Sequence, residues 1–151
     1  MKAAYEIRRM TNADLPHWAA MRSALWPEDS EAGHRAAITS LLAREDAWAF
    51  LAASATGAPL GFAELAIRPY ANGCDSAPVP FLEGIWVRAD VRRQGIGAGM
   101  LAYMTSFLLE HGFREVGSDT PIANLPSQAA HRAWGFSETE RVVYFRKLLH
   151  R

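Results

Sequence analysis

An apolar stretch that runs directly into an arginine-rich and glycine-rich turn is the feature that most restricts how this chain can fold. From Val87 to Met100 the sequence reads V-R-A-D-V-R-R-Q-G-I-G-A-G-M. This order predicts a strand, a tight turn and the first turn of a helix. Glycines let the backbone approach a ligand closely, and the first N–H groups of a helix have no internal partners and bind anions.

The turn itself, R-x-x-G-x-G-A from Arg92 to Ala98, differs from two common phosphate motifs. The chain has no G-x-x-x-x-G-K-[ST] P-loop, and Met100 stands where a dinucleotide fingerprint needs its third glycine. The alternative interpretation is a solvated turn with a glycine-softened helix start. Each glycine costs about 1 kcal/mol inside a helix. We therefore expect a phosphate or pyrophosphate to bind at this turn.

Composition predicts one globular domain over residues 1–151, because half of the 151 residues are hydrophobic and can form a real core. A net charge of zero argues against nucleic acid or a membrane as the partner. The lone cysteine, Cys74, allows neither an internal disulfide nor a cysteine metal cluster. No signal peptide or membrane span is recognisable, so a cytoplasmic protein is expected. We expect no metal site, and we interpret as surface residues His17, His34, His111 and His150.

Hydrophobic periodicity predicts a mixed α/β sheet covered by helices. Strands are expected over Tyr5–Met10, Ala47–Ala53, Leu60–Arg68, Phe81–Val87, Val116–Thr120 and Thr139–Leu148. Helices are expected from a Thr11 or Asn12 cap to Trp26, and over Glu31–Arg44, Gly97–Glu110 and Pro126–Trp134. A turn at Thr56–Pro59 joins two strands into a hairpin, and Pro69–Pro80 is expected to be a long polar loop.

This order of elements resembles the fold of the GCN5-related N-acetyltransferases, an α/β fold with a central mixed sheet flanked by helices. The turn from Arg92 to Ala98 is similar to that family's pyrophosphate loop for acetyl-CoA, and H-R-A-W-G-F at His131–Phe136 is similar to its second motif. The resemblance covers nearly the whole chain. It implies a cofactor site formed by Ile85, Trp86, Val87, Arg93, Gln94, Gly95, Ile96, Gly97, Ala98 and Asn124.

A narrower resemblance is to the aminoglycoside 6'-N-acetyltransferases. Short matching stretches are L-W-P at Leu25–Pro27, Y-A-N-G-C-D-S at Tyr70–Ser76, F-L-E-G-I at Phe81–Ile85, S-D-T at Ser118–Thr120 and G-F-S-E-T-E-R-V at Gly135–Val142. The resemblance implies a polycationic aminosugar as acceptor and a homodimer. Trp26 and Tyr70 would flank the sugar rings, although core packing is the usual fate of such aromatic residues. Asn124 would contact the pantetheine arm, or simply cap a helix.

Acetyl transfer to a cationic amine calls for carboxylates that hold the amine and draw protons from it, and Glu83 and Asp119 are the first catalytic candidates, with Glu83 as the candidate base. Glu83 interrupts an apolar strand, where an unpaired charge is costly, so it either faces the acceptor or pairs with an arginine. Asp119 follows the next strand, where ligand clefts of α/β sheets lie, or else caps a turn. Asp29 and Glu140 are further candidates that could equally be solvated.

His131 occupies the position where many acetyltransferases of the wider family carry a tyrosine acid. It could protonate the departing thiolate, or it could be a surface residue of the helix. The resemblance implies that the N–H donated to the thioester carbonyl comes from the strand before the loop, here Ile85 to Val87, and Gly84 is consistent with a bulge that frees it.

These features favour an acetyl-CoA-dependent aminoglycoside 6'-N-acetyltransferase that confers antibiotic resistance. One alternative is an acetyltransferase of the same fold that acts on a polyamine, a metabolite or a protein N-terminus. Another is a non-catalytic acetyl-CoA sensor, which would need the arginine and glycine turn but neither Glu83 nor Asp119.

Overall fold

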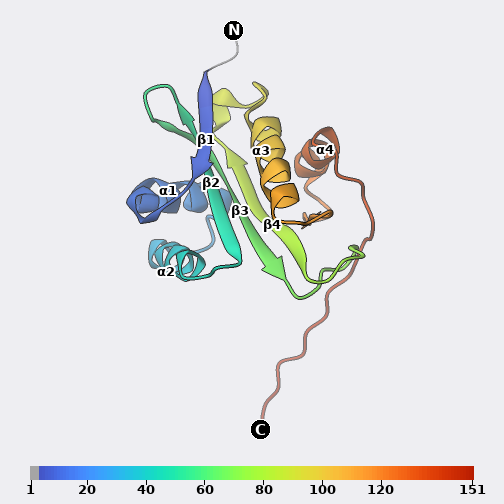
Figure 1. Cartoon of the computed structure of the whole chain (residues 1–151). Helices are drawn as coiled ribbons and strands as arrows, with labels where there is room; N and C mark the ends of the chain where they lie inside the picture. The colour runs from blue at the N-terminus through green and yellow to red at the C-terminus, as the bar shows by residue number, and fades with distance from the viewer. Residues whose placement is uncertain (1–3) are drawn as a thin grey trace.

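A five-stranded mixed sheet forms the centre of the protein, whose computed structural model describes residues 4–151. The strands lie in chain order, β1-β2-β3-β4-β5, and the first four run antiparallel while β5 runs parallel to β4 (Figure 1). The predicted mixed α/β architecture is confirmed. The strands are β1 Tyr5–Arg9, β2 Ala47–Ser54, β3 Pro59–Arg68, β4 Val79–Val87 and β5 Gly117–Ser118.

Helices cover both faces of the sheet. On one face lie α1 (Leu15–Leu25) and α2 (Glu31–Leu42), and on the other lie α3 (Ile96–Glu110) and α4 (Leu125–Ala133) (Figure 1). The core beneath α1 and α2 includes Trp18, Ile38 and Phe62, and the core beneath α3 includes Phe50 and Met100. Short 3-10 turns precede α1 (Asn12–Asp14) and follow β4 (Ala89–Val91).

A buried ion pair joins α1 to the sheet. Glu64 on β3 is 3% exposed, and both of its carboxylate oxygens accept hydrogen bonds of 2.6 Å from Arg22. Trp18 Nε1 donates to the same carboxylate at 2.8 Å, so the buried charge is fully partnered. His34 extends this network, since its Nδ1 accepts from Arg22 Nε at 3.3 Å. The interpretation of His34 as a surface residue is wrong, because its side chain is wholly buried.

A β-bulge interrupts β4 at Glu83. Glu64 pairs with Gly84 and the next residue, Leu65, pairs with Leu82, so Glu83 is the extra residue. A bulge was predicted from Gly84, and the structure gives that glycine a packing role as well. A Cβ at Gly84 would stand 2.5 Å from Cη2 of Trp26.

The strands β4 and β5 stop pairing at this bulge. Within the described chain, their pairing is confined to Phe81 with Gly117 and Leu82 with Ser118. β4 continues to Val87 with β3 on one side and no strand on the other. The unpaired part of β4, Glu83–Val87, and the carboxyl end of β5 therefore bound a region next to the turn that leads into α3, hereafter the opening.

The strand predicted over Thr139–Leu148 is not found, and that prediction is wrong for the isolated chain. Residues 137–151, the C-terminal tail, have no regular secondary structure; the tail first runs along the body, where Thr139 and Tyr144 line cavities, and its end then extends away (Figure 1). The alternation of apolar and polar side chains indicated a strand, but the sheet of the same chain offers this segment no partner. The predicted Val116–Thr120 strand is also shorter, being restricted to Gly117–Ser118.

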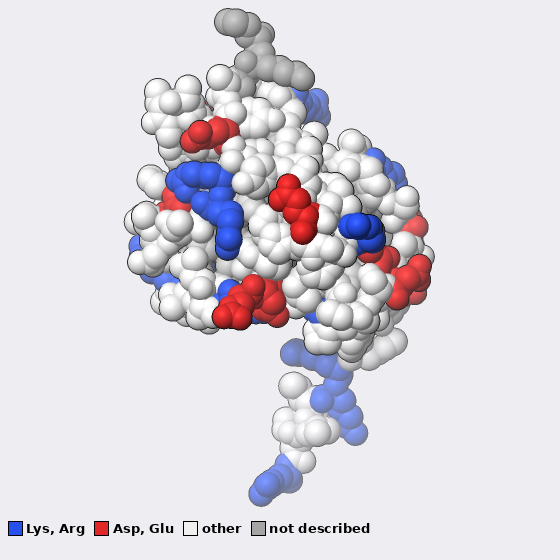
Figure 2. Space-filling model, in the orientation of Figure 1, with Lys and Arg blue, Asp and Glu red and all other residues white. Residues whose placement is uncertain are grey.

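Charged side chains of both signs are interspersed over the face of the body seen in Figure 2, while the projecting tail carries basic ones. Among residues 4–151, no helix combines the length and the apolar character needed to cross a bilayer. No group of three or more His, Cys, Asp or Glu side chains in that range is arranged to hold a metal ion.

Candidate active site

The turn before α3 is shaped to expose backbone N–H groups. Gly95, the residue that precedes the helix, is left-handed with φ of 87°, and Arg93 is also left-handed with φ of 60°. A non-glycine residue rarely adopts this conformation, and strain of this kind concentrates at ligand sites. No side chain caps α3, so its first N–H groups remain available as donors. The predicted cofactor residues of this turn are thus adjacent: Arg93, Gln94, Gly95, Ile96, Gly97 and Ala98.

Two side chains hold this turn in place. Tyr5 Oη on β1 donates a hydrogen bond of 3.2 Å to the carbonyl of Gly95, and a Cβ at Gly99 would collide with the same tyrosine ring. Arg92 Nε donates to the carbonyl of Val87 at 2.8 Å, which ties the turn back to the end of β4. Sequence patterns could not identify this role of Tyr5, because its contact spans ninety residues of chain.

The free edge of β4 presents backbone donors toward the opening. Arg88 N–H points toward β3 and bonds the carbonyl of Leu60 at 2.8 Å. Because backbone groups alternate sides along a strand, the N–H groups of Val87 and Ile85 point to the opposite, unpaired edge. Trp86 points its N–H toward β3, so of the three predicted donors in β4, Ile85 and Val87 fit the role.

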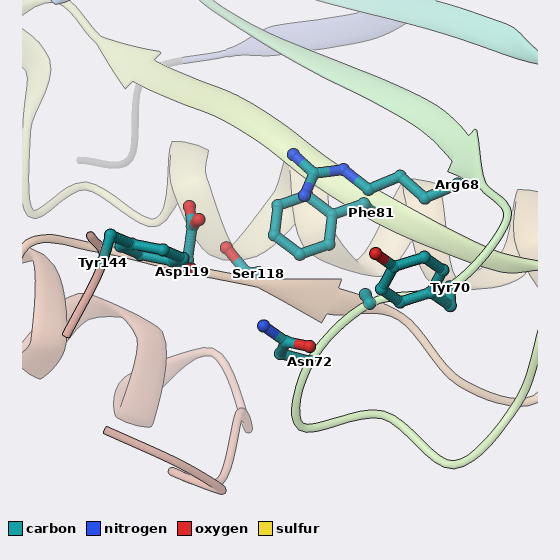
Figure 3. Close-up of a pocket in the computed structure, with 8 residues that line it drawn as sticks. Arg68, Tyr70, Asn72, Phe81, Ser118, Asp119 and Tyr144 are labelled. Carbon is teal, nitrogen blue, oxygen red and sulfur yellow. The ribbon is translucent and has the colours of Figure 1, made fainter. Parts of the chain in front are cut away.

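A cavity of about 270 Å³ lies at the mouth of the opening between β4 and β5. Figure 3 shows the Arg68 guanidinium above the Phe81 ring, Tyr70 and Asn72 on the loop side, and Asp119 beside Tyr144. Asp119 is exposed, as a carboxylate that meets a soluble cation must be. The residues that line the cavity are Arg68, Tyr70, Ala71, Asn72, Phe81, Ser118, Asp119 and Tyr144.

Glu83 pairs with Arg68 at the rim of this cavity. Arg68 Nε donates to Glu83 Oε1 at 2.8 Å and the guanidinium donates to Oε2 at 2.6 Å, while the Arg68 guanidinium carbon lies 3.5 Å from the centre of the Phe81 ring. These hydrogen bonds raise the pKa of Arg68 above its usual value. The side chains are 39% and 30% exposed, so this is a rim pair. The alternative in which Glu83 pairs with an arginine is therefore the observed arrangement.

Other predicted acceptor residues lie apart from the cavity lining. Trp26 packs edge-on against Phe62, at 6.3 Å between ring centres, and under the Arg22 guanidinium at 4.6 Å. Asp29 is exposed after α1, and Glu140 is exposed on the C-terminal tail. Of the predicted acceptor residues, the structure thus places Tyr70 and Asp119 together in the cavity lining.

The loop that carries Tyr70 and Asn72 is anchored by Glu115. This carboxylate, two residues before β5, accepts hydrogen bonds from the Ser76 hydroxyl at 2.5 Å, from Ser76 N–H at 2.8 Å and from Asp75 N–H at 3.1 Å. The Ser76 hydroxyl is the main cause of a lowered pKa for Glu115, followed by the two backbone donors. The anchor therefore joins one wall of the cavity to the strand that forms its floor.

His131 on α4 meets the cavity wall through Ser118. Its Nε2 lies 2.8 Å from Ser118 Oγ, and its Nδ1 lies 2.7 Å from the carbonyl of Ser127. A carbonyl can only accept, so the ring proton sits on Nδ1 and Nε2 accepts from the serine hydroxyl. Asn124 caps the same helix, since its Oδ1 accepts from Ser127 N–H at 3.1 Å.

Sequence reasoning missed several cavity residues, and some could have been found. Ser118 lies within the quoted S-D-T stretch, beside the chosen Asp119, and Asn72 lies within the quoted loop. Arg68 ends a predicted strand, and its position opposite β4 follows from the hairpin register. Tyr144 could not have been found, because its place depends on where the tail leaves the body.

Comparison with known proteins gives one consistent family. The profile of the Acetyltransferase (GNAT) family matches residues 18–136. An aminoglycoside N(6')-acetyltransferase type 1 of Serratia marcescens is 48% identical over 90% of this chain and 94% of its own length. One of Salmonella typhimurium strain LT2 is 41% identical over 94% of this chain and 98% of its own length.

Solved structures agree with these sequence matches. The aminoglycoside antibiotic 6'-N-acetyltransferase AAC(6')-Ih from Acinetobacter baumannii superposes with a TM-score of 0.91 at 36% identity, covering 97% of this chain and 100% of that one. AAC(6')-Iy in complex with the bisubstrate analogue CoA-S-monomethyl-acetylneamine superposes with a TM-score of 0.90 at 39% identity, with the same coverage.

Proposed function

Because the chain belongs to the acetyltransferase (GNAT) family, we propose that it transfers an acetyl group from acetyl-CoA to the 6'-amino group of aminoglycoside antibiotics and so confers resistance to them. The observation that carries the proposal is the pairing of two sites within one opening. An uncapped helix N-terminus lies at one end, and a cavity with an exposed carboxylate lies at the other. An acetyl-CoA sensor would need the first site alone.

The residues around the α3 turn fit the phosphate end of acetyl-CoA. The left-handed Arg93 and Gly95 direct consecutive N–H groups outward, and the helix dipole adds partial positive charge. When bound, acetyl-CoA supplies an activated acetyl group as a thioester. The outward N–H groups of Ile85 and Val87 are placed to hold the thioester end in the opening, and Asn124 is our candidate for the arm between the two ends.

The acceptor half of the opening suits a polyhydroxylated amine. Asp119 offers a carboxylate to an ammonium group, and Tyr70 and Phe81 offer ring faces to a sugar. The Arg68–Glu83 pair keeps the rim nearly neutral, which leaves Asp119 as the uncompensated charge among the lining residues. We propose that Glu83 makes a polar contact with the acceptor. We also propose that Asp29, Glu140 and Trp26 contact the acceptor from outside the cavity and favour a cationic ligand.

The decisive experiment is a thiol-release assay with acetyl-CoA and three amines: kanamycin, spermidine and a peptide with a free N-terminus. We expect kanamycin to give the highest kcat/KM and its product to carry the acetyl group on the 6'-nitrogen by NMR. A preference for spermidine or the peptide would replace the proposal by another acetyltransferase activity. Tight acetyl-CoA binding without thiol release from any amine would favour a sensor.

We further propose that the protein is a homodimer joined through its C-terminal tails. Six large apolar side chains of the tail are 47% to 92% exposed, which is far more than a soluble chain leaves uncovered in one segment. The free edge beyond β5 offers unpaired backbone groups to a strand, and the tail carries the alternating pattern of one. The exposed residues are Val142, Val143, Tyr144, Phe145, Leu148 and Leu149.

Light scattering after size-exclusion chromatography tests the dimer directly. Wild type should elute with twice the chain mass of 16.7 kDa, and Phe145→Asp should shift the protein to the monomer. Leu109→Asp is the matched control, because Leu109 is an exposed apolar residue on α3, away from the tail. A monomeric wild type would refute the dimer and leave the proposed activity standing.

The whole chain, residues 1–151, is on this proposal one acetyltransferase domain, since a single sheet packs one core against each helical layer. Its place of action would be the cytoplasm, where acetyl-CoA is produced.

A further inference from the structure

The point at which β4 and β5 separate carries a serine that is hydrogen-bonded to a histidine. Ser118 is the last residue of β5 and pairs with Leu82, one residue before the bulge. Its side chain lines the 270 Å³ cavity, and it also lines a second cavity of about 320 Å³ between α3, β5 and residues 134–139. Ser118 therefore lies between the two cavities and belongs to the lining of both.

The geometry of the pair fixes which atom holds the ring proton. His131 Nδ1 is 2.7 Å from the Ser127 carbonyl, which must be an acceptor, so Nδ1 carries hydrogen. Nε2 then carries a lone pair and lies 2.8 Å from Ser118 Oγ, so the Ser118 hydroxyl donates its hydrogen to Nε2. The ring is held further by Trp134 and Phe136, whose ring centres are 5.4 and 5.2 Å away. A nucleophile-like hydroxyl and an oriented base thus form a preorganised pair.

On the premise of the proposed acetyl transfer, we infer that Ser118 is a catalytic residue that carries the reaction's proton between the acceptor amine and His131, and then from His131 to the departing sulfur. His131 is the positioning residue that acts through it. The step starts from the neutral amine, after its ammonium form has lost one proton to water, and from there it balances without any further reactant. As the C–N bond forms, the amine nitrogen gives one proton to Ser118 Oγ while the Ser118 hydroxyl gives its own to His131 Nε2. As the C–S bond breaks, the same two transfers run backward and the proton ends on sulfur.

This route explains why neither carboxylate is needed as the base. Both oxygens of Glu83 already accept hydrogen bonds from Arg68, and Asp119 is an exposed carboxylate that serves as a charge for the ligand. An imidazole takes up and releases protons near neutral pH more readily than a carboxylate does. Because the Ser118 hydroxyl lies between His131 and the cavity, His131 can exchange the proton without contacting the sugar.

The kinetic test uses substitutions that separate proton transfer from packing. His131→Gln can still hydrogen-bond Ser118 but cannot take up a proton, and Ser118→Thr keeps the hydroxyl. We expect Ser118→Ala and His131→Gln each to lower kcat by about 10- to 100-fold, at or below the lower end of acid–base effects, with both KM values within about twofold. The double variant should be no slower than the worse single one, because the pair acts as a unit. Ser118→Thr should keep most of the activity.

Ser40→Ala, an exposed serine of α2 on the other face of the sheet, is the matched control and should be unchanged. A kcat for Ser118→Ala within twofold of wild type would overturn the inference. Multiplicative losses in the double variant, or losses confined to KM, would overturn it as well. A Ser118→Thr variant as slow as Ser118→Ala would show that the hydroxyl does not carry the effect.

A second measurement does not depend on turnover. Nitrogen-15 NMR of the histidine rings in the unliganded protein should show His131 as the Nδ1–H tautomer, and Ser118→Ala should shift its Nε2 resonance. An Nε2–H tautomer would refute the proton route by itself. If kanamycin were not acetylated, the variants would be compared with whichever amine is turned over. If no amine were turned over, the proposed function would fail and the proton route with it, while the tautomer would still test the Ser118–His131 hydrogen bond.

Discussion

Gly97 lies directly beneath the indole ring of Trp134: a Cβ at residue 97 would stand 2.8 Å from Cζ2 of that ring. This relationship joins the predicted pyrophosphate turn to the end of α4, two segments that the sequence holds far apart. The glycine was predicted to serve the ligand. The structure shows that it also makes room for a neighbouring side chain.

Gly97→Val should therefore displace Trp134 and lower both the melting temperature and the affinity for acetyl-CoA, the latter by tenfold or more. We expect Trp134→Ala in the same chain to restore most of both, because the added side chain points at the indole. Calorimetric titration and thermal unfolding measure the two quantities. An affinity that stays low in the double variant would show that the ligand itself requires the glycine.

Glu83→Gln and Asp119→Asn each remove one negative charge from the acceptor side of the opening. Glu83→Gln also leaves the Arg68 guanidinium without its carboxylate, which would repel a cationic sugar. We expect each change to raise the KM for kanamycin by about tenfold, roughly 1.4 kcal/mol, and to leave the KM for acetyl-CoA unchanged. Glu31→Gln, which breaks an exposed pair with Arg35 on α2, is the control. Near-normal kinetics in both variants would move the acceptor site elsewhere.

Glu115→Gln should loosen the loop that carries Tyr70 and Asn72. The folded-state pKa of Glu115 is lowered, chiefly by the Ser76 hydroxyl, so its ionised form stabilises the fold. That stabilisation is present above the ordinary glutamate pKa of about 4.3 and is lost as pH falls through the lower folded value. Urea unfolding from pH 3 to 7 should show wild type more stable than the variant above about pH 4.5, with the difference closing in acid. A constant difference across this range would contradict the anchor.

Glu64→Gln should destabilise the protein by about 3 kcal/mol or more, since it leaves the Arg22 charge buried without its carboxylate. Asp46→Asn is the matched control. Its pair with Arg44 is exposed and should contribute less than about 1 kcal/mol. Urea denaturation of both variants at neutral pH compares the two, and equal small losses would mean that water reaches the Arg22–Glu64 pair.

The sequence predicted the helices, the hairpin and the turn before α3 because each depends on local signals. Thr11 does cap the first turn, where Asp14 completes a capping box, and Asn124 caps α4. These contacts lie within four residues, so composition and spacing suffice to find them.

What the sequence could not supply depends on contacts between distant segments. The buried state of His34 requires Arg22, which α1 brings to it, and the pairing of Glu83 with Arg68 requires the register of β3 with β4. The tail was predicted as a strand from its alternating pattern, yet a pattern does not say which sheet edge will receive it. Whether the cavity residues bind an aminoglycoside stays a prediction.

The extra residue at Glu83 lets both halves of β4 place apolar side chains in the same core. Leu82 and Ile85 both pack toward α3 although three positions separate them, and Trp86 packs toward α1. Deleting Glu83 would leave Leu82 opposite Leu65 and Gly84 opposite Glu64, so every later residue would keep its partner and its face. Deleting Ile85 instead would move each later residue by one position, sending the Trp86 indole toward α3. The fold should therefore tolerate the loss of one residue at the bulge far better than the same loss a few positions later in the strand.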